Sequence, residues 1–408
     1  MPEESNRISR RRSDLYPLCA HIDPFAAYLG AMGYAPLTLR EKVRFVRQFG
    51  RWMELKRVSL KAFDEALIDK ALELDERTGD RRKTLLQFLE HLREKGVASP
   101  AATREDGSPA ARLERRYARY LDEERGLADV TVVNYRSLVQ PLLTQQFGDG
   151  PVRLAHLSPR GVTDFLLRHL KTMSPKRGQL LGCALRSFLR FLFLEAKTKV
   201  DLSLAVPTVR QFRKAAVPQY LAAEDVERIL AVCDLGTSVG RRNQAVLLLL
   251  ARLGLRAGEI VRLELGDVYW RAGELLVRGK GQCHDRLPLP KDVGEALTLY
   301  LAKDRTPCSS RRLFLRMRAP RRGFESAAAV TTIVKRAIDR SGLRPPHRGA
   351  HLLRHSLATG MIRRGATMAE IGQLLRHRSP NTTELYAKVD FEGLRGVSLP
   401  WSGMAGGR

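Results

Sequence analysis

Residues 351–359 read His-Leu-Leu-Arg-His-Ser-Leu-Ala-Thr and form the most informative stretch of this chain. Prolines at 345 and 346 come shortly before it. Because proline favours the start of a helix over its interior, the stretch predicts a helix that ends near Gly365. His351 and Arg354 are three residues apart, so they share one face of that helix. Since an arginine can grip a phosphate through two parallel N–H bonds, this face predicts a phosphate-binding site.

Three histidines, His347, His351 and His355, recur at intervals of four residues across the same stretch. On a helix such spacing brings side chains to one face, where they could bind a metal ion. No acidic or cysteine ligand accompanies them, and the preceding prolines weaken the helix at His347, so a metal site is not expected. His355 is interpreted as a histidine that packs within the helix.

Two cations precede this helix in well-defined local settings. An apolar helical run ends at Gly254, a residue type that commonly terminates helices, and Arg256 follows two positions later. The arginine therefore lies in a tight turn with a fixed backbone. Further on, residues 274–278 and 285–289 predict a β-hairpin with Lys280 at its tip. A lysine placed there beside DNA can protonate a leaving 5′ oxygen as a general acid.

A histidine and a tyrosine complete the pattern downstream. His377 follows Arg376, and Tyr386 comes nine positions after His377. Taken singly, each of these residues has an ordinary structural explanation. Together, the arginines, the lysine and the two histidines can hold a phosphate while the Tyr386 hydroxyl attacks it. Six such residues in this order predict an enzyme that cuts and rejoins DNA through a phosphotyrosine.

The composition agrees with a nucleic-acid partner. Among 408 residues, 71 Lys plus Arg stand against 44 Asp plus Glu, a formal net charge of +27, and such an excess binds phosphates without regard to sequence. Charge alone does not separate a DNA-binding protein from one that is merely basic. The five cysteines are scattered without a Cys-x-x-Cys pair, so neither a disulfide framework nor a zinc ribbon is expected, and a reducing cytoplasm suits the chain. No signal peptide is indicated, and the longest apolar run, residues 245–251, is far short of the ~20 residues that span a membrane.

Helical periodicity and turn signals predict a mainly helical chain with several domains. The expected segments are a basic tail (1–17), a helical unit (18–97), a linker (98–110), a second helical unit (111–200), a second linker (201–216), a domain of helices with the small β-hairpin (217–390) and a C-terminal tail (391–408). The second helical unit repeats the pattern of the first, which we interpret as a duplication; the alternative is that two amphipathic helix bundles simply look alike.

Basic residues lie between the apolar positions of both helical units and in the second linker. These are Arg40 and Arg44, Arg136, and Arg210 and Arg213. Helices that pack on one side and face phosphates on the other have cations in such places, so these residues are expected to contact DNA. A solvated helix face is the alternative for each of them.

These strings resemble the tyrosine recombinase family, which includes phage integrases, Xer-type recombinases and related transposon recombinases. The matching strings are residues 254–259, 279–281, 351–359 and 375–387. The resemblance is strong over 217–390, as an α+β catalytic domain. It extends more loosely over 111–199, as a helical core-binding domain, and the unit at 18–97 would be an arm-binding module or a second clamp on DNA.

The resemblance implies a role for each residue that would meet the phosphate. Tyr386 would be the nucleophile and would form a 3′-phosphotyrosine bond. Arg256 and Arg354 would bind the scissile phosphate and its developing charge. Lys280 would be the general acid for the 5′ hydroxyl.

The resemblance also implies supporting residues. His351 would transfer a proton to and from the tyrosine, His377 would donate a hydrogen bond to the phosphate, and Glu259 would fill the family's acidic position. One residue departs from the pattern, because family members often have glycine where this chain has Arg376. The arginine adds a cation that is expected to contact DNA, but it lacks the backbone freedom of glycine.

The resemblance implies no metal and no nucleotide cofactor, because the phosphotyrosine bond itself stores the energy for rejoining. It implies double-stranded DNA as the partner, self-assembly on DNA from dimer to tetramer through a Holliday junction, and work in the bacterial nucleoid for a mobile element, alongside sister recombinases. Apolar residues of the C-terminal tail would dock on a neighbouring subunit or pack in cis.

Two other functions use related features. A type IB topoisomerase shares the phosphotyrosine chemistry but acts as a monomer, and the helical units and the tail favour a recombinase over it. A DNA-binding regulator that kept the fold without catalysis is the other alternative. The complete set of six residues argues against a regulator.

Overall fold

The structure is a computed structural model that describes residues 18–72, 78–100, 107–148, 150–154, 157–209, 218–279 and 284–389. Predictions for Lys280, Arg210 and Arg213 and for both tails lie outside these residues. The chain divides into two compact units, one formed by residues 102–215 and the other by residues 1–101 with 216–408. The described residues are mainly helical and include one small antiparallel sheet, as the sequence predicts.

The first helical segment has its own hydrophobic core. Its elements are α2 (Cys19–Ala31), α3 (Pro36–Leu55), η1 (Leu60–Ala62), α4 (Glu65–Leu72) and α5 (Thr78–Glu94). Phe25 and Leu29 from α2, Val46 from α3 and Phe88 from α5 are fully buried in that core. The apolar residues of these helices recur at helical spacing and face this shared core.

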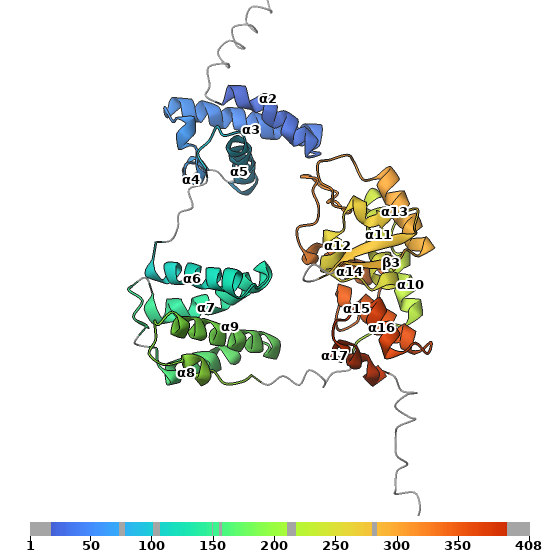
Figure 1. Cartoon of the computed structure of the whole chain (residues 1–408). Coiled ribbons are helices and arrows are strands. Elements are labelled where there is room, and N and C mark those ends of the chain that lie inside the picture. The colour runs from blue at the N-terminus through green and yellow to red at the C-terminus, as the bar shows by residue number, and fades with distance from the viewer. Residues whose placement is uncertain are drawn as a thin grey trace, which may run out of the picture. The chain divides into compact units, whose positions relative to one another are not determined.

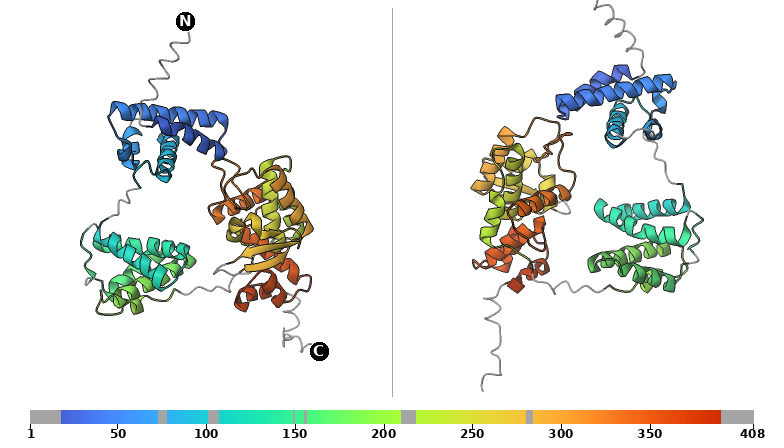
Figure 2. Two further views of the ribbon diagram at one scale, coloured as in Figure 1. Left: turned by 45° about the horizontal axis from the view of Figure 1, so that its top comes forward. Right: turned by 180° about the vertical axis from the view of Figure 1, so that it is seen from behind.

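Residues 102–215 form a second bundle of helices (Figures 1 and 2). Its elements are α6 (Pro109–Arg119), η2 (Tyr120–Glu124), α7 (Asp129–Phe147), α8 (Pro159–Leu170), α9 (Pro175–Leu194) and η4 (Leu202–Ala205). Three of these helices begin with proline, which lacks the N–H that a first helical residue cannot use. Serines accept N–H bonds at the starts of α6 and α8, Ser108 from Ala111 and Ser158 from Gly161, and so replace part of the missing hydrogen bonding.

Each bundle has an edge-to-face aromatic pair in its own core. In the first, the rings of Phe25 and Phe88 meet edge to face with centroids 4.8 Å apart. In the second, Tyr117 and Phe188 meet in the same manner at 5.0 Å. These are the positions at which the two sequence patterns correspond. The match supports a duplication, which stays a prediction.

The C-terminal part is built around a helix whose middle turns are buried on all sides. Its elements are α10 (Ala223–Ala231), α11 (Ser238–Leu253), α12 (Ala257–Arg262), η5 (Leu265–Asp267), β1 (Val268–Tyr269), β2 (Glu274–Arg278), β3 (His284–Pro288), α13 (Lys291–Lys303), α14 (Ala327–Arg340), α15 (Ala350–Ile362), α16 (Met368–Leu374), α17 (Pro380–Thr383) and η6 (Glu384–Val389). Residues 245–251 of α11 are all buried, and α11 contacts α10, α13, α14 and α15 (Figure 1). A helix that is apolar all round belongs in such a core.

The sheet is antiparallel, with strand order β1-β2-β3. Leu275 pairs with Leu287 across β2 and β3, and both are buried. The predicted hairpin is confirmed, although β3 begins and ends one residue earlier than expected. Strand β1 has only two residues, too few to show a period in the sequence. No helix among the described residues is long and apolar enough to cross a membrane.

Candidate active site

Arg256 is fixed at the junction of two helices. Helix α11 ends at Gly254 with a left-handed backbone, φ 57°, and a Cβ atom there would lie 2.6 Å from the Leu375 side chain. Arg256 then caps the N-terminus of α12. Its backbone N–H and its Nη1 each donate to the carboxylate of Glu259 at 2.8 Å. The predicted tight turn with a fixed backbone is confirmed.

Glu259 is a buried carboxylate shared by two arginines. Its side chain is 2% exposed, and one oxygen also accepts from Nη2 of Arg376 at 2.9 Å. Burial by itself would raise the pKa of Glu259. The charges of Arg376 and Arg256 and the hydrogen bonds from Arg256 outweigh burial, so this pKa lies below its ordinary value and the carboxylate stays ionised.

Arg354 is held between the ends of two helices. It is 3% exposed, and its two Nη atoms donate to the backbone oxygens of Gly254, after α11, and Leu375, after α16. Burial, and then the charges of Arg256 and Arg376, lower the pKa of Arg354 to about 10, so it remains a cation at neutral pH. An arginine has five N–H donors, so donors remain for an anion after these two bonds.

His377 is aimed by the turn that ends α16. Arg376 has a left-handed backbone, φ 55°, and the N–H of His377 reaches back to the oxygen of Gly372 at 2.9 Å, as in a Schellman cap. Ring atom Nδ1 lies 2.8 Å from the Thr383 hydroxyl. Burial, and then the charges of Arg354 and Arg256, lower the pKa of His377 to about 4. The neutral ring that results can donate from Nε2 when Nδ1 accepts from Thr383.

Tyr386 lies inside this group of residues. It is 2% exposed and belongs to the small core formed by α15, α16 and η6. Its ring is parallel to the ring of His377, with centroids 6.4 Å apart. Burial raises the pKa of the phenol, although the nearby charges of Arg354 and Arg256 oppose this rise.

The Tyr386 hydroxyl meets a histidine that the sequence did not single out as a site residue. Nδ1 of His355 lies 2.8 Å from the phenol oxygen. The interpretation of His355 as a packing residue missed this contact. The available signal was its four-residue spacing from His351, which was considered only as a metal pattern. His351, the expected partner of Tyr386, is exposed in the first turn of α15, with its ring centroid 6.2 Å from that of His355.

The residues expected to contact DNA have different surroundings. Arg40 and Arg44 are exposed on α3, and Arg136 binds Glu114 at 3.0 Å with 40% of its side chain exposed. Arg376 is only 5% exposed and is committed to Glu259. A contact between Arg376 and DNA would require this buried ion pair to open.

A cleft of ≈ 1110 Å³ lies over the site. Arg256, Arg376, His377 and Thr383 line it, together with Gly279, the last described residue before Lys280. Arg256 and His377 at one opening suit a phosphate, whereas Arg376 is held by Glu259. The structure therefore brings Arg256, Arg354, His377 and Tyr386 together, whereas Lys280 is not described.

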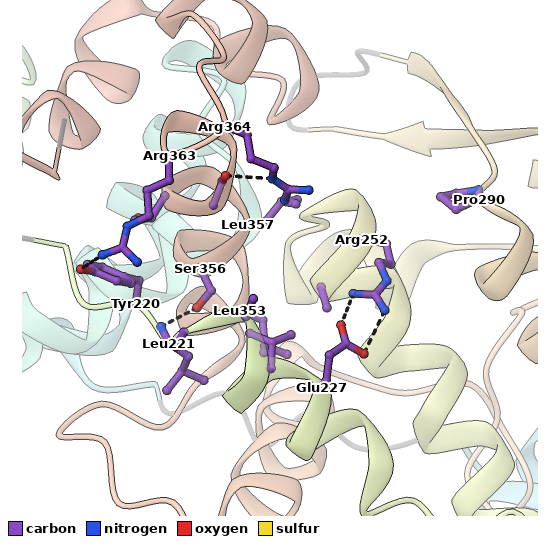
Figure 3. Close-up of a pocket in the computed structure, with 16 residues that line it drawn as sticks. Tyr220, Leu221, Glu227, Arg252, Pro290, Leu353, Ser356, Leu357, Arg363 and Arg364 are labelled. Atoms are coloured by element: carbon purple, nitrogen blue, oxygen red, sulfur yellow. Dashed lines mark hydrogen bonds and ion pairs between the residues drawn. The ribbon is translucent and has the colours of Figure 1, made fainter. Parts of the chain in front are cut away.

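A second pocket, of ≈ 750 Å³, borders another face of α15 (Figure 3). Leu353, Ser356 and Gly360 line it. At about 100° per helical residue, they lie roughly opposite His351 and Arg354. In Figure 3 the Ser356 hydroxyl accepts from the N–H of Leu221 at 2.8 Å. This bond anchors α15 on the side away from the catalytic residues.

Comparisons with known proteins identify a family and several relatives of this chain. A model described as the phage integrase family matches residues 219–392. The integrase/recombinase y4rA of Sinorhizobium fredii is 37% identical over 394 residues, which cover 95% of this chain and 96% of y4rA.

Solved structures share the fold at lower identity. The XerH site-specific recombinase bound to a palindromic difH substrate has a TM-score of 0.56 and 20% identity, with 83% of this chain and 94% of that chain covered. A lambda integrase tetramer bound to a Holliday junction has a TM-score of 0.52 and 17% identity, with 81% and 90% covered.

Proposed function

The chain belongs to the phage integrase family of tyrosine recombinases, which cleave and rejoin DNA at specific sites, and we propose that Tyr386 is its nucleophile. The observation that carries this proposal is the grouping of Arg256, Arg354 and His377 around Tyr386, beside a cleft of ≈ 1110 Å³. The phenol oxygen forms a bond to phosphorus, and the bond from phosphorus to the 5′ oxygen breaks. A 3′-phosphotyrosine and a free 5′ hydroxyl result, and rejoining reverses both steps.

The other residues act on charge and protons. Arg256 and Arg354 stabilise the negative charge that develops on the phosphate, and His377 donates a hydrogen bond to it from Nε2. Lys280 gives a proton to the leaving 5′ oxygen, a role that its place in the sequence between β2 and β3 supports. Because Tyr386 is 2% exposed, DNA binding must move some of the residues that bury it before the phosphate reaches the phenol oxygen.

The helical segments bind DNA. We propose that residues 111–200 form the core-binding domain and residues 18–97 a further DNA-binding module, with Arg40, Arg44 and Arg136 on phosphates. Copies assemble on DNA as dimers and tetramers through a Holliday junction, for which the lambda integrase tetramer is the precedent. A mobile element in a bacterial cell is the setting that suits such an enzyme.

Covalent attachment to DNA tests the nucleophile. The chain and its Tyr386→Phe variant are incubated with nicked duplexes that tile the DNA flanking the gene, and adducts are separated on a denaturing gel. The unchanged chain should form adducts with at least one duplex. The variant should bind that duplex equally well and form no adduct. Adducts in the variant would show that another residue is the nucleophile.

The topoisomerase alternative needs a separate test. A supercoiled plasmid without the flanking DNA should remain supercoiled, because a recombinase acts on its site in an assembly. Efficient relaxation of that plasmid by a monomer would favour a type IB topoisomerase over the proposed function.

A further inference from the structure

We propose that His355 is the catalytic residue that takes the proton of Tyr386 during cleavage and returns it during rejoining. Nδ1 of His355 lies 2.8 Å from the phenol oxygen, which is hydrogen-bond distance to the atom that attacks phosphorus. The proposal rests on the proposed role of Tyr386 as nucleophile. It gives the phenol proton to a residue other than His351.

Other proton acceptors around the phenol are less well placed. Glu259 already accepts two hydrogen bonds from Arg256 and one from Arg376. His377 stacks parallel to the tyrosine ring, and its Nδ1 is bound to Thr383. His351 is exposed in the first turn of α15, with its ring centroid 6.2 Å from that of His355, whereas the ring of His355 contacts the tyrosine directly.

The protonation state of His355 leaves a lone pair for this task. Burial, and then the charges of His351 and Arg354, lower the pKa of His355 to about 4, so the ring is neutral at physiological pH. With its own proton on Nε2, the ring can accept the phenol proton at Nδ1. An incoming phosphate places a negative charge beside Arg354. The phosphate charge offsets the positive charge of Arg354, which lowers the pKa of His355 in the absence of DNA. The pKa of His355 therefore rises when DNA binds.

Protons and bonds balance in each direction. In cleavage, the bond from the Tyr386 oxygen to phosphorus forms, the phenol proton moves to Nδ1 of His355, and the 5′ oxygen leaves with a proton from Lys280. In rejoining, the 5′ hydroxyl attacks phosphorus and gives its proton back to Lys280, while the bond from phosphorus to the Tyr386 oxygen breaks. Nδ1 of His355 then gives the proton back to the phenol oxygen. A residue on the reacting atom can serve as base in one direction and acid in the other.

Two substitutions separate proton transfer from hydrogen bonding. His355→Asn places an amide near the position of Nδ1, where it can still hydrogen-bond the phenol but cannot take its proton. His355→Gln places the amide near Nε2 and serves as the second variant if the first unfolds. His169→Asn is the matched control, because His169 is also a partly buried helical histidine whose Nδ1 has a single partner, the oxygen of Phe165 at 2.9 Å.

The measurement is the single-turnover rate of adduct formation on the flanking duplex that reacts with the unchanged chain, together with binding of that duplex. His355→Asn should slow adduct formation by about a hundredfold or more and leave DNA binding unchanged, while His169→Asn should leave the rate of adduct formation at saturating duplex nearly unchanged. A rate equal to that of the unchanged chain would overturn the proposal. A faster rate would also overturn it, because the hydrogen bond would then hold Tyr386 in a resting position.

A slow His355→Asn variant could lack a proton acceptor or have a distorted site. Replacing Tyr386 by a fluorinated tyrosine distinguishes these two explanations. Fluorination makes the phenol more acidic, so the nucleophile depends less on a proton acceptor. With the fluorinated tyrosine, the rate of the His355→Asn chain should be closer to the rate of the chain that keeps His355. If the difference between the two rates stays the same, His355 only positions Tyr386 and the proposal is overturned. If Tyr386→Phe still forms adducts, the proposed nucleophile fails. If only the His355 results fail, the proposed function stands.

Discussion

At the scale of single residues, the buried carboxylate of Glu259 pairs with two arginines, of which Arg376 is buried and Arg256 is 39% exposed. The side chain of Glu259 is 2% exposed and that of Arg376 is 5% exposed, with 2.9 Å between the charged atoms. Glu259→Gln should lower the free energy of unfolding by about 3–5 kcal/mol, because it leaves a buried guanidinium without its counter-charge. Urea unfolding followed by circular dichroism measures this loss.

An exposed ion pair of similar length is the control for that prediction. Glu227 binds Arg252 at 2.7 Å, but 57% of the glutamate side chain is exposed. Glu227→Gln should therefore cost no more than about 1 kcal/mol. Equal losses for the two variants would mean that burial does not set the strength of the Glu259 pair.

Residue types and order were predictable from the sequence, whereas several contacts were not. Tyr386 meets His355 across 31 positions of chain, and Arg376 meets Glu259 across 117. The first pair depends on how α15 packs against η6. The second depends on how α12 packs against the end of α16. Local spacing carries no information about such contacts, so a single sequence shows His355 only as one more histidine on a helix.

At the scale of elements, the end of α16 has an arginine where a glycine would be unstrained. Arg376 has φ 55°, a conformation that costs a residue with a Cβ atom about 1–2 kcal/mol. Arg376→Gly and Arg376→Ala both remove the pair with Glu259, but only the glycine removes the strain. The glycine variant should therefore be the more stable of the two by about 1 kcal/mol, as measured by urea unfolding. An alanine variant of equal or greater stability would contradict a strained cap.

The elements themselves followed closely from the sequence where local signals were strong. The β2–β3 hairpin and the helix after the prolines were expected, and α15 ends at Ile362, just short of the expected Gly365. The cap at Arg376 was not foreseen as left-handed. Arginine gives no local sign of such a backbone, and the ion pair that offsets the strain comes from a distant helix.

At the scale of the whole molecule, a net charge of +27 predicts DNA binding that weakens steeply with salt. Each phosphate contact contributes about 0.9 to the slope of log K against log salt. Arg40 and Arg44 are exposed on α3. If both lie on phosphates, replacing both by serine should lower the magnitude of the slope by about 1.8. Fluorescence anisotropy with a duplex at about 50–200 mM salt measures the slope.

The control removes the same net charge from arginines that already have partners. Arg82 binds Asp69 at 2.7 Å and Arg228 binds Asp225 at 3.2 Å, and all four side chains are partly exposed. Replacing Arg82 and Arg228 by serine removes two charges, as in the α3 variant, but no expected phosphate contact. The slope should then change by much less than 1.8. Equal changes of the slope in the two double variants would mean that overall charge, rather than phosphate contacts of α3, determines the salt dependence of DNA binding.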